Sequence, residues 1–309
     1  MDNDGAIGID SVDIIVQAQK GEIAFTSDRD GNYEIYVMNA DGSNVTRLTN
    51  DPASDECPRW SRDGTRIAFL SNRTGNWQIW VMNADGSNAR QVTDIPEGVN
   101  PDNCAGLSWY PNDQKISFIR RDYYLCSINI DGTNLVEIIP PDNPGLPYPH
   151  MLPAPNGCDI SPDGTRFVVL KKFSDWGHDV ELFIADINGN YLYQLTDTPL
   201  GDKQESQNAA WSPNGDKIAF EGIRYWISGE KNIFMINPDG SNLVNITDLP
   251  EVPWAAGMPR WSPEGDKIIF HGKAFTPDFE IYVINKDGTN LINLTNNPAN
   301  DIHPDWRWQ

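Results

Sequence analysis

The chain has 309 residues, and 44 acidic side chains outnumber 23 basic ones, which gives a formal net charge of −21. Such a charge repels phosphate groups, so we expect neither nucleic acid nor an anionic membrane surface as a partner. The longest apolar runs, such as residues 67–70, fall far short of the roughly 20 residues that span a bilayer, so no membrane insertion is expected.

The first twenty residues, MDNDGAIGIDSVDIIVQAQK, differ in character from the rest of the chain. They have no basic region and no long apolar stretch, which argues against a signal peptide. They also lack the repeat that begins at residue 21, so we divide the chain into a segment of residues 1–20 and a domain of residues 21–309. The stretch SVDIIVQAQ has β-strand character, and two pairings are open to it: an edge of its own domain, or an edge of a neighbouring copy.

From residue 21 onward the chain repeats with a period of about 50 residues. The octapeptide VMNADGSN occurs at residues 37–44 and again at residues 81–88. A second marker of the form WSPxG, intact or degenerate, begins at intervals of 49, 51, 51, 50 and 45 residues, at Trp60, Trp109, Ile160, Trp211, Trp261 and Trp306. A fixed period of this length is typical of stacked repeat units.

Each repeat unit contains the signals of four short strands. In residues 58–93 these are PRWS, RIAFLS, WQIWVMN and ARQVT, separated by RDGT, NRTGN and ADGSN. β-branched and aromatic runs between Gly, Asn and Asp clusters indicate strands joined by turns, and no segment shows the 3.6-residue period of a helix. The pattern predicts an all-β protein, a six-bladed β-propeller with four antiparallel strands in each blade.

The two ends of the repeat region complement each other. GEIAFTS, from residue 21, matches the second strand of a unit, and HPDWRW, from residue 303, matches a first strand. We therefore predict that the C-terminal strand joins the N-terminal blade and closes the ring, which removes the exposed edges of an open sheet.

The repeat unit P-x-W-S-P-[DNE]-G…I-x-F…G-N-x-x-I-[YW]-V-M-N-x-D-G-S-N…L-T resembles the TolB-like, WD-repeat-like propeller family over residues 21–308. The resemblance implies an isolated propeller that serves as a binding platform in the periplasm or as a secreted protein. Related propellers accompany hydrolase domains, but this chain has no G-x-S-x-G nucleophile motif. Twenty residues before the repeats are also too few for the α/β domain that precedes the propeller of TolB.

The Asp-Gly turns and the loop at residues 27–34 are the two features that resemble calcium loops. We interpret the turns as hairpins with positive φ at both central residues, because calcium needs six to eight converging oxygens. The loop, SDRDGNYE, alternates four oxygen-bearing side chains: Asp28, Asp30, Asn32 and Glu34. This spacing partly matches a calcium loop, so two interpretations are open, a calcium site and a solvated acidic loop. The expected cofactor is none, or calcium at this loop.

Polar side chains near the first strand of each unit are the next candidates. Asp55 and Asp301 precede a marker tryptophan by five residues, and Arg59 and Arg260 precede one directly. All four are expected near the central channel. The carboxylates either form inter-blade ion pairs and backbone caps, or they belong to a ligand site at the channel mouth.

Histidines and cysteines provide weaker signals. We expect His303 on an inner strand and His271 in a loop between second and third strands, so no catalytic metal site is expected. Cys57 and Cys104 precede the first strands of successive units, and we predict a disulfide between them.

Aromatic residues of the loops between second and third strands, with those of the inter-blade loops, are expected on one face of the propeller. There they would bind a peptide, a protein or a sugar polymer. The alternative is that some of them, notably Trp77, pack between blades. The candidates are Trp77, Tyr123, Trp176, Trp226, Trp254 and Phe275.

Three functions follow from these observations. The first is a non-catalytic, extracytoplasmic scaffold that binds a protein or peptide. The second is a self-assembling structural subunit of an extracellular or envelope assembly, which uses the N-terminal segment. The third is a metal-dependent polysaccharide lyase or hydrolase, and an enzyme is less favoured than a binding protein because no catalytic motif is present.

Overall fold

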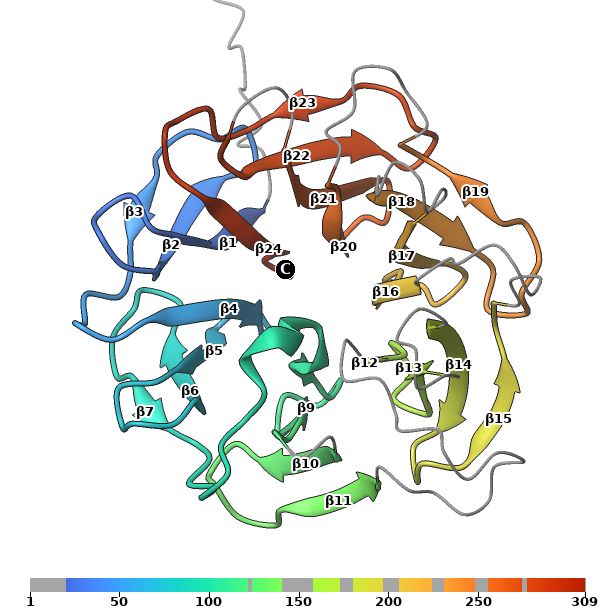
Figure 1. Ribbon diagram of the computed structural model, residues 1–309, viewed down its shortest axis with the longest axis horizontal. Helices are drawn as coiled ribbons and strands as arrows, with labels where there is room; N and C mark the ends of the chain where they lie inside the picture. Colours follow the sequence, from blue (N-terminus) through green and yellow to red (C-terminus); the bar gives the residue numbers. More distant parts are fainter. Residues whose placement is uncertain are drawn as a thin grey trace, which may run out of the picture.

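The computed structural model describes residues 21–121, 124–140, 158–172, 180–196, 206–223, 231–247, 255–273 and 277–308. Within them, six four-stranded antiparallel sheets surround a central axis like the blades of a propeller (Figure 1). The predicted fold class is therefore confirmed. The strand expected in SVDIIVQAQ lies outside the described residues.

We number the blades in chain order. Blade 1 contains β24 (Asp301–Trp306), β1 (Glu22–Ser27), β2 (Glu34–Asn39) and β3 (Thr46–Arg47). Blade 2 contains β4 (Asp55–Trp60), β5 (Arg66–Ser71), β6 (Gln78–Asn83) and β7 (Arg90–Gln91). Blade 3 contains β8 (Ser108–Trp109), β9 (Lys115–Ile119), β10 (Leu125–Asn129) and β11 (Val136–Ile139), preceded by the 3-10 helix η1 (Pro101–Gly106).

Blade 4 contains β12 (Cys158–Ile160), β13 (Arg166–Lys172), β14 (Val180–Asp186) and β15 (Tyr191–Gln194). Blade 5 contains β16 (Ser206–Trp211), β17 (Ile218–Ile223), β18 (Lys231–Ile236) and β19 (Val244–Asn245). Blade 6 contains β20 (Gly257–Trp261), β21 (Lys267–Gly272), β22 (Glu280–Asn285) and β23 (Ile292–Asn293).

The ring closes as the repeat phase predicts. β24 pairs antiparallel with β1, and Ile23 lies opposite Trp306 while Ala24 lies opposite Asp305. The last strand of the chain is thus the innermost strand of the first blade. This arrangement joins the two ends of the repeat region in one sheet, so the edge of blade 1 is covered.

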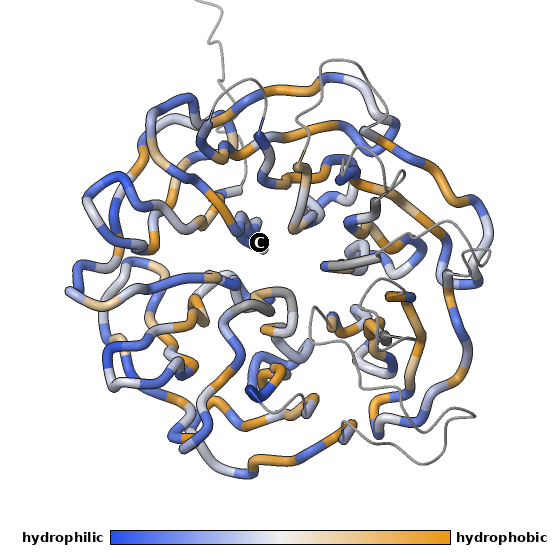
Figure 2. Tube along the Cα trace, viewed as in Figure 1, coloured by the Kyte–Doolittle hydropathy of each residue, from blue (hydrophilic) through white to orange (hydrophobic). Residues whose placement is uncertain are grey.

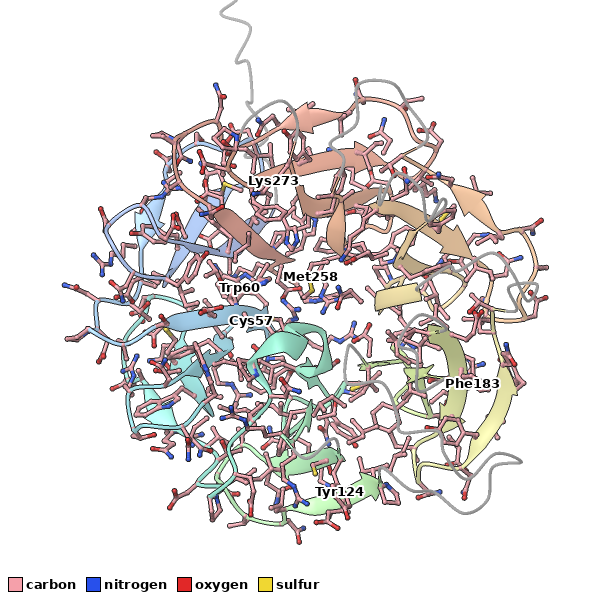
Figure 3. All side chains as sticks on the ribbon, in the orientation of Figure 1. Cys57, Trp60, Tyr124, Phe183, Met258 and Lys273 are labelled. Carbon is pink, nitrogen blue, oxygen red and sulfur yellow. A yellow bond between two sulfur atoms is a disulfide. The ribbon has the colours of Figure 1, made fainter. Side chains whose placement is uncertain are left out.

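Four of the inner strands contain a β-bulge three residues before the marker tryptophan. The bulged residues have positive φ: Cys57 at 62°, Asn208 at 52°, Met258 at 55° and His303 at 55°. A bulge inserts an unpaired residue and redirects its side chain. Figure 3 shows Cys57 and Met258 near the centre of the ring. The bulges therefore place these side chains beside the channel.

The Asp-Gly segments form the hairpins between third and outer strands. In blade 1 the N–H of Gly42 donates to the carbonyl of Asn39 at 2.9 Å, and the N–H of Ser43 donates to Asp41 Oδ1 at 2.9 Å. Positive φ occurs at Gly42 (82°) and Asn44 (55°) but not at Asp41. The turn is therefore of type I with Gly in the last position. The prediction of a hairpin is correct, and the prediction of positive φ at both central residues is wrong.

These turns also join neighbouring blades. A Cβ atom on Gly86 would lie 2.9 Å from the carbonyl oxygen of Leu48, at the end of the outer strand of blade 1. Glycine is needed there both for its positive φ and for the close approach of two backbones. Figure 2 shows apolar residues in the middle strands, which form the core, and also along outer strands such as β11 and β23.

Candidate functional site

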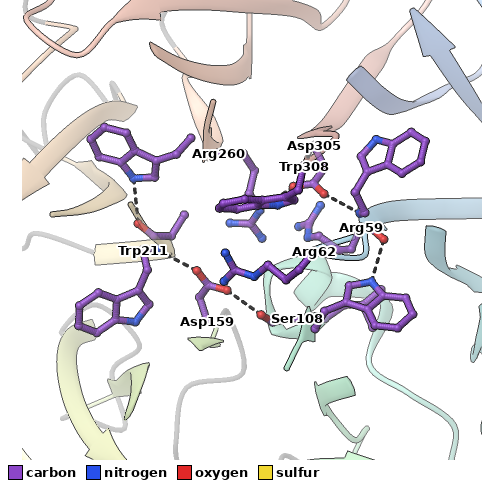
Figure 4. Close-up of a pocket in the computed structure, with 13 residues that line it drawn as sticks. Arg59, Arg62, Ser108, Asp159, Trp211, Arg260, Asp305 and Trp308 are labelled. Atoms are coloured by element: carbon purple, nitrogen blue, oxygen red, sulfur yellow. Dashed lines mark hydrogen bonds and ion pairs between the residues drawn. The ribbon is translucent and has the colours of Figure 1, made fainter. Parts of the chain in front are cut away.

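The residues directly before the repeat markers, five tryptophans and Ile160, surround a small cavity on the central axis (Figure 4). Its volume is about 40 Å³, which holds a few water molecules but no sugar or peptide. The position contributes one side chain from each blade: Arg59, Ser108, Asp159, Ala210, Arg260 and Asp305. The predicted location of Arg59 and Arg260 near the channel is confirmed.

The six side chains form a ring around the cavity, and Asp305 is the acidic residue in one half of this ring. Its carboxylate accepts a hydrogen bond from the backbone N–H of Trp60 at 2.7 Å and lies 3.6 Å from Arg260 Nε. Burial raises the pKa of Asp305, and the guanidinium groups of Arg59 and Arg260 oppose that shift. Burial, followed by the charge of Arg260, lowers the pKa of Arg59 to about 9. The two arginines therefore depend on Asp305 for charge compensation.

Asp159 occupies the equivalent place in the other half. It accepts hydrogen bonds from Ser108 Oγ at 2.7 Å and from the backbone N–H of Trp211 at 2.8 Å. The indole of Trp109 donates to the carbonyl of Arg59 at 2.9 Å, and that of Trp261 donates to Ala210 at 3.1 Å. With the Asp305 contacts, these bonds link every blade to both of its neighbours. The six side chains therefore hold the blades together around the channel. Sequence reasoning missed Asp159 and Ser108, although both directly precede a repeat marker and that spacing could have identified them.

Asp55 and Asp301 are fully buried and are paired with arginines. Arg73 Nη2 lies 2.6 Å from Asp55 Oδ2, and Arg29 Nη2 donates to both oxygens of Asp301 at 2.9 and 3.0 Å. Each pair lies within one blade, so the expectation of inter-blade ion pairs is corrected. Burial raises the pKa of Asp55, and Arg73 opposes the shift. These contacts favour the ion-pair interpretation over a ligand site.

The polar side chains of the loop at residues 27–34 form hydrogen bonds with other residues of the same chain. Asp28 accepts hydrogen bonds from the backbone N–H and the Nδ2 of Asn300 at 2.8 and 2.9 Å, and Asp30 accepts one from the hydroxyl of Tyr36. Asn32 Nδ2 donates to the carbonyl of Asp51 at 2.9 Å. Glu34 accepts from Arg47 Nη2 and from the N–H of Asp51, both at 2.8 Å. This geometry favours the acidic-loop interpretation, and calcium at this loop stays a prediction.

The aromatic candidates are only partly described. Trp77 is half-buried and packs against the core cluster of blades 2 and 3, which supports the packing interpretation for this residue. Five others lie outside the described residues: Tyr123, Trp176, Trp226, Trp254 and Phe275. An aromatic binding face at these positions stays a prediction.

Cysteine and histidine side chains meet beside the channel. Cys57 and Cys104 form the predicted disulfide, with Cα atoms 5.2 Å apart. His271 lies on β21, so its assignment to a loop is wrong, and its ring centroid is 5.7 Å from that of His303. Burial lowers the pKa of His271 to about 3, and burial followed by the charge of His271 lowers the pKa of His303 well below its usual range. Both imidazoles are neutral at physiological pH.

The outer rim carries the exposed apolar side chains of the described residues. Each is on an outer strand or directly before one, and each is 39–54% exposed: Val45, Leu135, Val136, Leu192, Tyr193, Leu243, Val244 and Ile292. They come from five blades, and blade 2 contributes none. Sequence reasoning missed this surface because it concentrated on the loops.

The described residues include no helix with the length and apolar character to cross a membrane. Residues 18–138 match the family model of the TolB beta propeller domain, PD40. None of the curated proteins matches the sequence significantly.

Solved structures share the fold along most of the chain. TolB from Acinetobacter baumannii has a TM-score of 0.76 and 16% identity, over 94% of this chain and 68% of that one. The putative TolB from Agrobacterium tumefaciens has a TM-score of 0.65 and 19% identity, over 89% and 88%. An oligogalacturonate lyase in complex with manganese has a TM-score of 0.52 and 13% identity, over 88% and 84%. The chain has the same six-bladed β-propeller fold as these structures, and its residues 18–138 match the TolB propeller family model.

Proposed function

We propose that this protein is a non-catalytic, extracytoplasmic scaffold that binds a protein or peptide partner along the outer edges of its blades. The observation that carries the proposal is the row of exposed apolar side chains on the outer strands of five blades. Covering such side chains with a partner removes apolar surface from water, which is the main driving force of protein association. The small central cavity offers no comparable area.

The edge of blade 4 fits an extended polypeptide. β15 has four residues, whereas the outer strands of blades 1, 2, 5 and 6 have two. Among the described residues it pairs with β14 on one side and with no strand on the other, so a further strand can be added at its outer edge. Leu192 is 52% exposed and Tyr193 39% exposed on this strand. A partner strand added here would form main-chain hydrogen bonds and bury one of these side chains on each face.

Charge adds a second requirement on the partner. The net charge of −21 attracts basic polypeptides and accelerates their association. We therefore infer that the partner contributes an extended segment with apolar residues on the contact face and a basic surface around it. Binding is expected to weaken as the salt concentration rises.

A photo-cross-linking amino acid at position 192 tests this proposal in an envelope extract of the source organism. The matched control is the same amino acid in place of Arg90, on the outer strand of blade 2, which has no exposed large apolar side chain. We expect a heterologous protein cross-linked at position 192 and not at position 90. The purified partner should bind Leu192→Asp at least tenfold more weakly than the wild type.

Two outcomes would overturn the proposal. One is the absence of heterologous cross-links at position 192, and the other is equal affinity of the purified partner for the wild type and Leu192→Asp. Cross-links exclusively between copies of this chain would instead support the self-assembling subunit.

The disulfide supports the extracytoplasmic location. Structural disulfides persist in oxidising compartments and are rare in the cytosol. Cys126 and Cys158 are buried and do not take part in this disulfide, so protein unfolded without reductant is expected to titrate two thiols. Four thiols in protein taken directly from cells into a thiol-blocking buffer would place the chain in a reducing compartment.

A metal-dependent polysaccharide lyase is the second candidate, favoured by the contact between His271 and His303 and by the fold shared with oligogalacturonate lyase. Incubation with polygalacturonate and Mn²⁺, followed by the absorbance of unsaturated uronates, tests it. Product formation that disappears in His303→Ala would establish the enzyme, and absence of product would exclude this reaction.

A further inference from the structure

Three side chains of metal-ligand type, from three separate elements, meet beside the channel. Cys57 lies on β4, Cys104 on η1 and His303 on β24, and their Sγ, Sγ and Nδ1 atoms lie within 4.8 Å of one another. His303 Nδ1 faces Cys57 Sγ at 3.8 Å. In tetrahedral coordination, with metal–sulfur and metal–nitrogen bonds of about 2.3 and 2.0 Å, such atoms lie about 3.5 Å apart. The separation of Cys57 Sγ and His303 Nδ1 is close to this value, whereas the two sulfur atoms, which are bonded to each other in the disulfide, must move apart after reduction.

The backbone around these three ligands is held independently of the bond between the sulfurs. The N–H of Cys57 donates to Thr26 Oγ1 at 3.0 Å, and Arg59 Nη2 donates to the carbonyl of Cys104 at 3.1 Å. The N–H of His303 donates to His271 Nδ1 at 3.2 Å. Because these contacts do not involve the sulfur atoms, we expect the backbone of the three residues to stay in place after reduction, while the two sulfur atoms separate.

Met258 supplies a further soft donor at the same level of the channel. It occupies the bulge of β20 in blade 6, yet its side chain packs in the core cluster that contains Cys57 and Cys104 of blades 2 and 3. Met258 is only 7% exposed. Thioether and thiolate sulfur suit Cu(I), whereas two thiolates and an imidazole suit Zn²⁺. His303 is partly exposed and offers a route from the channel.

We propose that, in the reduced protein, Cys57, Cys104 and His303 bind one thiophilic metal ion, Zn²⁺ or Cu(I), with Met258 as the additional ligand of Cu(I). Two molecules of an external thiol reduce the disulfide, giving two protein thiols and one external disulfide. Metal binding then releases both thiol protons to water. A disulfide leaves no thiolate for the metal, so oxidation and metal binding exclude each other. The Arg59 guanidinium beside the site offsets the charge of two thiolates around Cu(I).

Cobalt(II) provides a spectroscopic probe for this site in the full-length chain. Protein reduced with a thiol and desalted without oxygen should bind one equivalent of Co²⁺ with a thiolate-to-cobalt charge-transfer band, which Zn²⁺ abolishes by displacement. Unreduced protein should show no band. We expect C57S/C104S to lose the band and His303→Ala to bind at least tenfold more weakly, while C126S/C158S, which removes the other two cysteines, retains it.

The proposal is overturned if reduced wild type lacks the band or if C57S/C104S keeps it. Should that variant fail to fold by circular dichroism, alkylation of the reduced wild type decides. One equivalent of Zn²⁺ should slow modification of Cys57 and Cys104, and equal rates with and without Zn²⁺ would refute the site. Met258→Leu should lower the affinity for Cu(I) and leave that for Zn²⁺ unchanged; an unchanged Cu(I) affinity would exclude Met258 as a ligand.

Discussion

The outer ends of the blades are nearly identical, whereas their inner ends differ. At the outer hairpins a Ser or Thr N–H donates to the turn aspartate at 2.9–3.0 Å in five blades, through Asp41, Asp85, Asp131, Asp239 and Asp287. At the inner ends, one position carries Arg, Ser, Asp, Ala, Arg and Asp in turn. The repeated contacts at the outer hairpins set the spacing of the blades. The side chains that differ at the inner ends determine the chemistry of the channel.

Removal of residues 302–309 is the strongest test of the inner ends. It deletes most of β24, including Trp306, which is 3% exposed, and opens the sheet of blade 1. We expect no cooperative thermal transition by circular dichroism, because a ring propeller without its closing strand exposes two core surfaces. Arg307→Ala, which removes the ion pair with Glu22 and the hydrogen bond to the carbonyl of Gly64, is the milder comparison and should lower the midpoint but keep a cooperative transition. A truncated chain with an unchanged midpoint would contradict the closure argument.

Replacing the two ring aspartates compares the two halves of the channel. Asp305→Ala leaves Arg59 and Arg260 without their carboxylate, and removal of one partner from such a buried group costs about 3–5 kcal/mol. Asp159→Ala removes hydrogen bonds to Ser108 and Trp211, at a cost of about 1–3 kcal/mol. Urea unfolding of both variants measures the difference. Equal losses of unfolding free energy in the two variants would show that charge compensation by Asp305 does not contribute to stability.

Substitutions at two glycines of blade 2 distinguish the cost of a positive φ from the cost of disturbing a contact between blades. Gly86 and Gly75 both have positive φ, 84° and 102°, but a Cβ on Gly75 would meet nothing within 4 Å. Gly75→Ala should cost about 1 kcal/mol from φ alone. Gly86→Ala should cost about 2–3 kcal/mol, because it also pushes the turn away from Leu48. If the two variants unfold at the same urea concentration, the contact of the Gly86 turn with Leu48 of the neighbouring blade does not contribute to stability.

A pH dependence at His271 tests the contact between blade 6 and the closing strand of blade 1. Its pKa is about 3 in the folded protein and about 6.5 when unfolded, so the unfolded state binds the proton more readily between these values. Stability is therefore lost as the pH falls below about 6.5. From about pH 7 to pH 5, the wild type should lose up to about 2 kcal/mol more than His271→Asn. Parallel pH profiles for the two proteins in urea unfolding would contradict a neutral buried His271.

Much of the architecture was predictable from the sequence by itself. The number of blades, the four strands of each and the closure by the C-terminal strand follow from the phase of a repeat, which depends on spacing and not on detailed contacts. The Cys57–Cys104 bridge was predictable for the same reason, since both cysteines lie a few residues before the marker tryptophans of adjacent units.

The chemistry of the channel was decided by the tertiary structure alone. Repeat phase assigns a residue to a strand, but a bulge decides which way its side chain turns, as at Cys57, Met258 and His303. Contacts across the ring also join residues remote in the sequence: Asp305 and Trp60 are 245 positions apart. His271 and His303 meet because blade 6 packs against the closing strand of blade 1, an adjacency that no local pattern encodes.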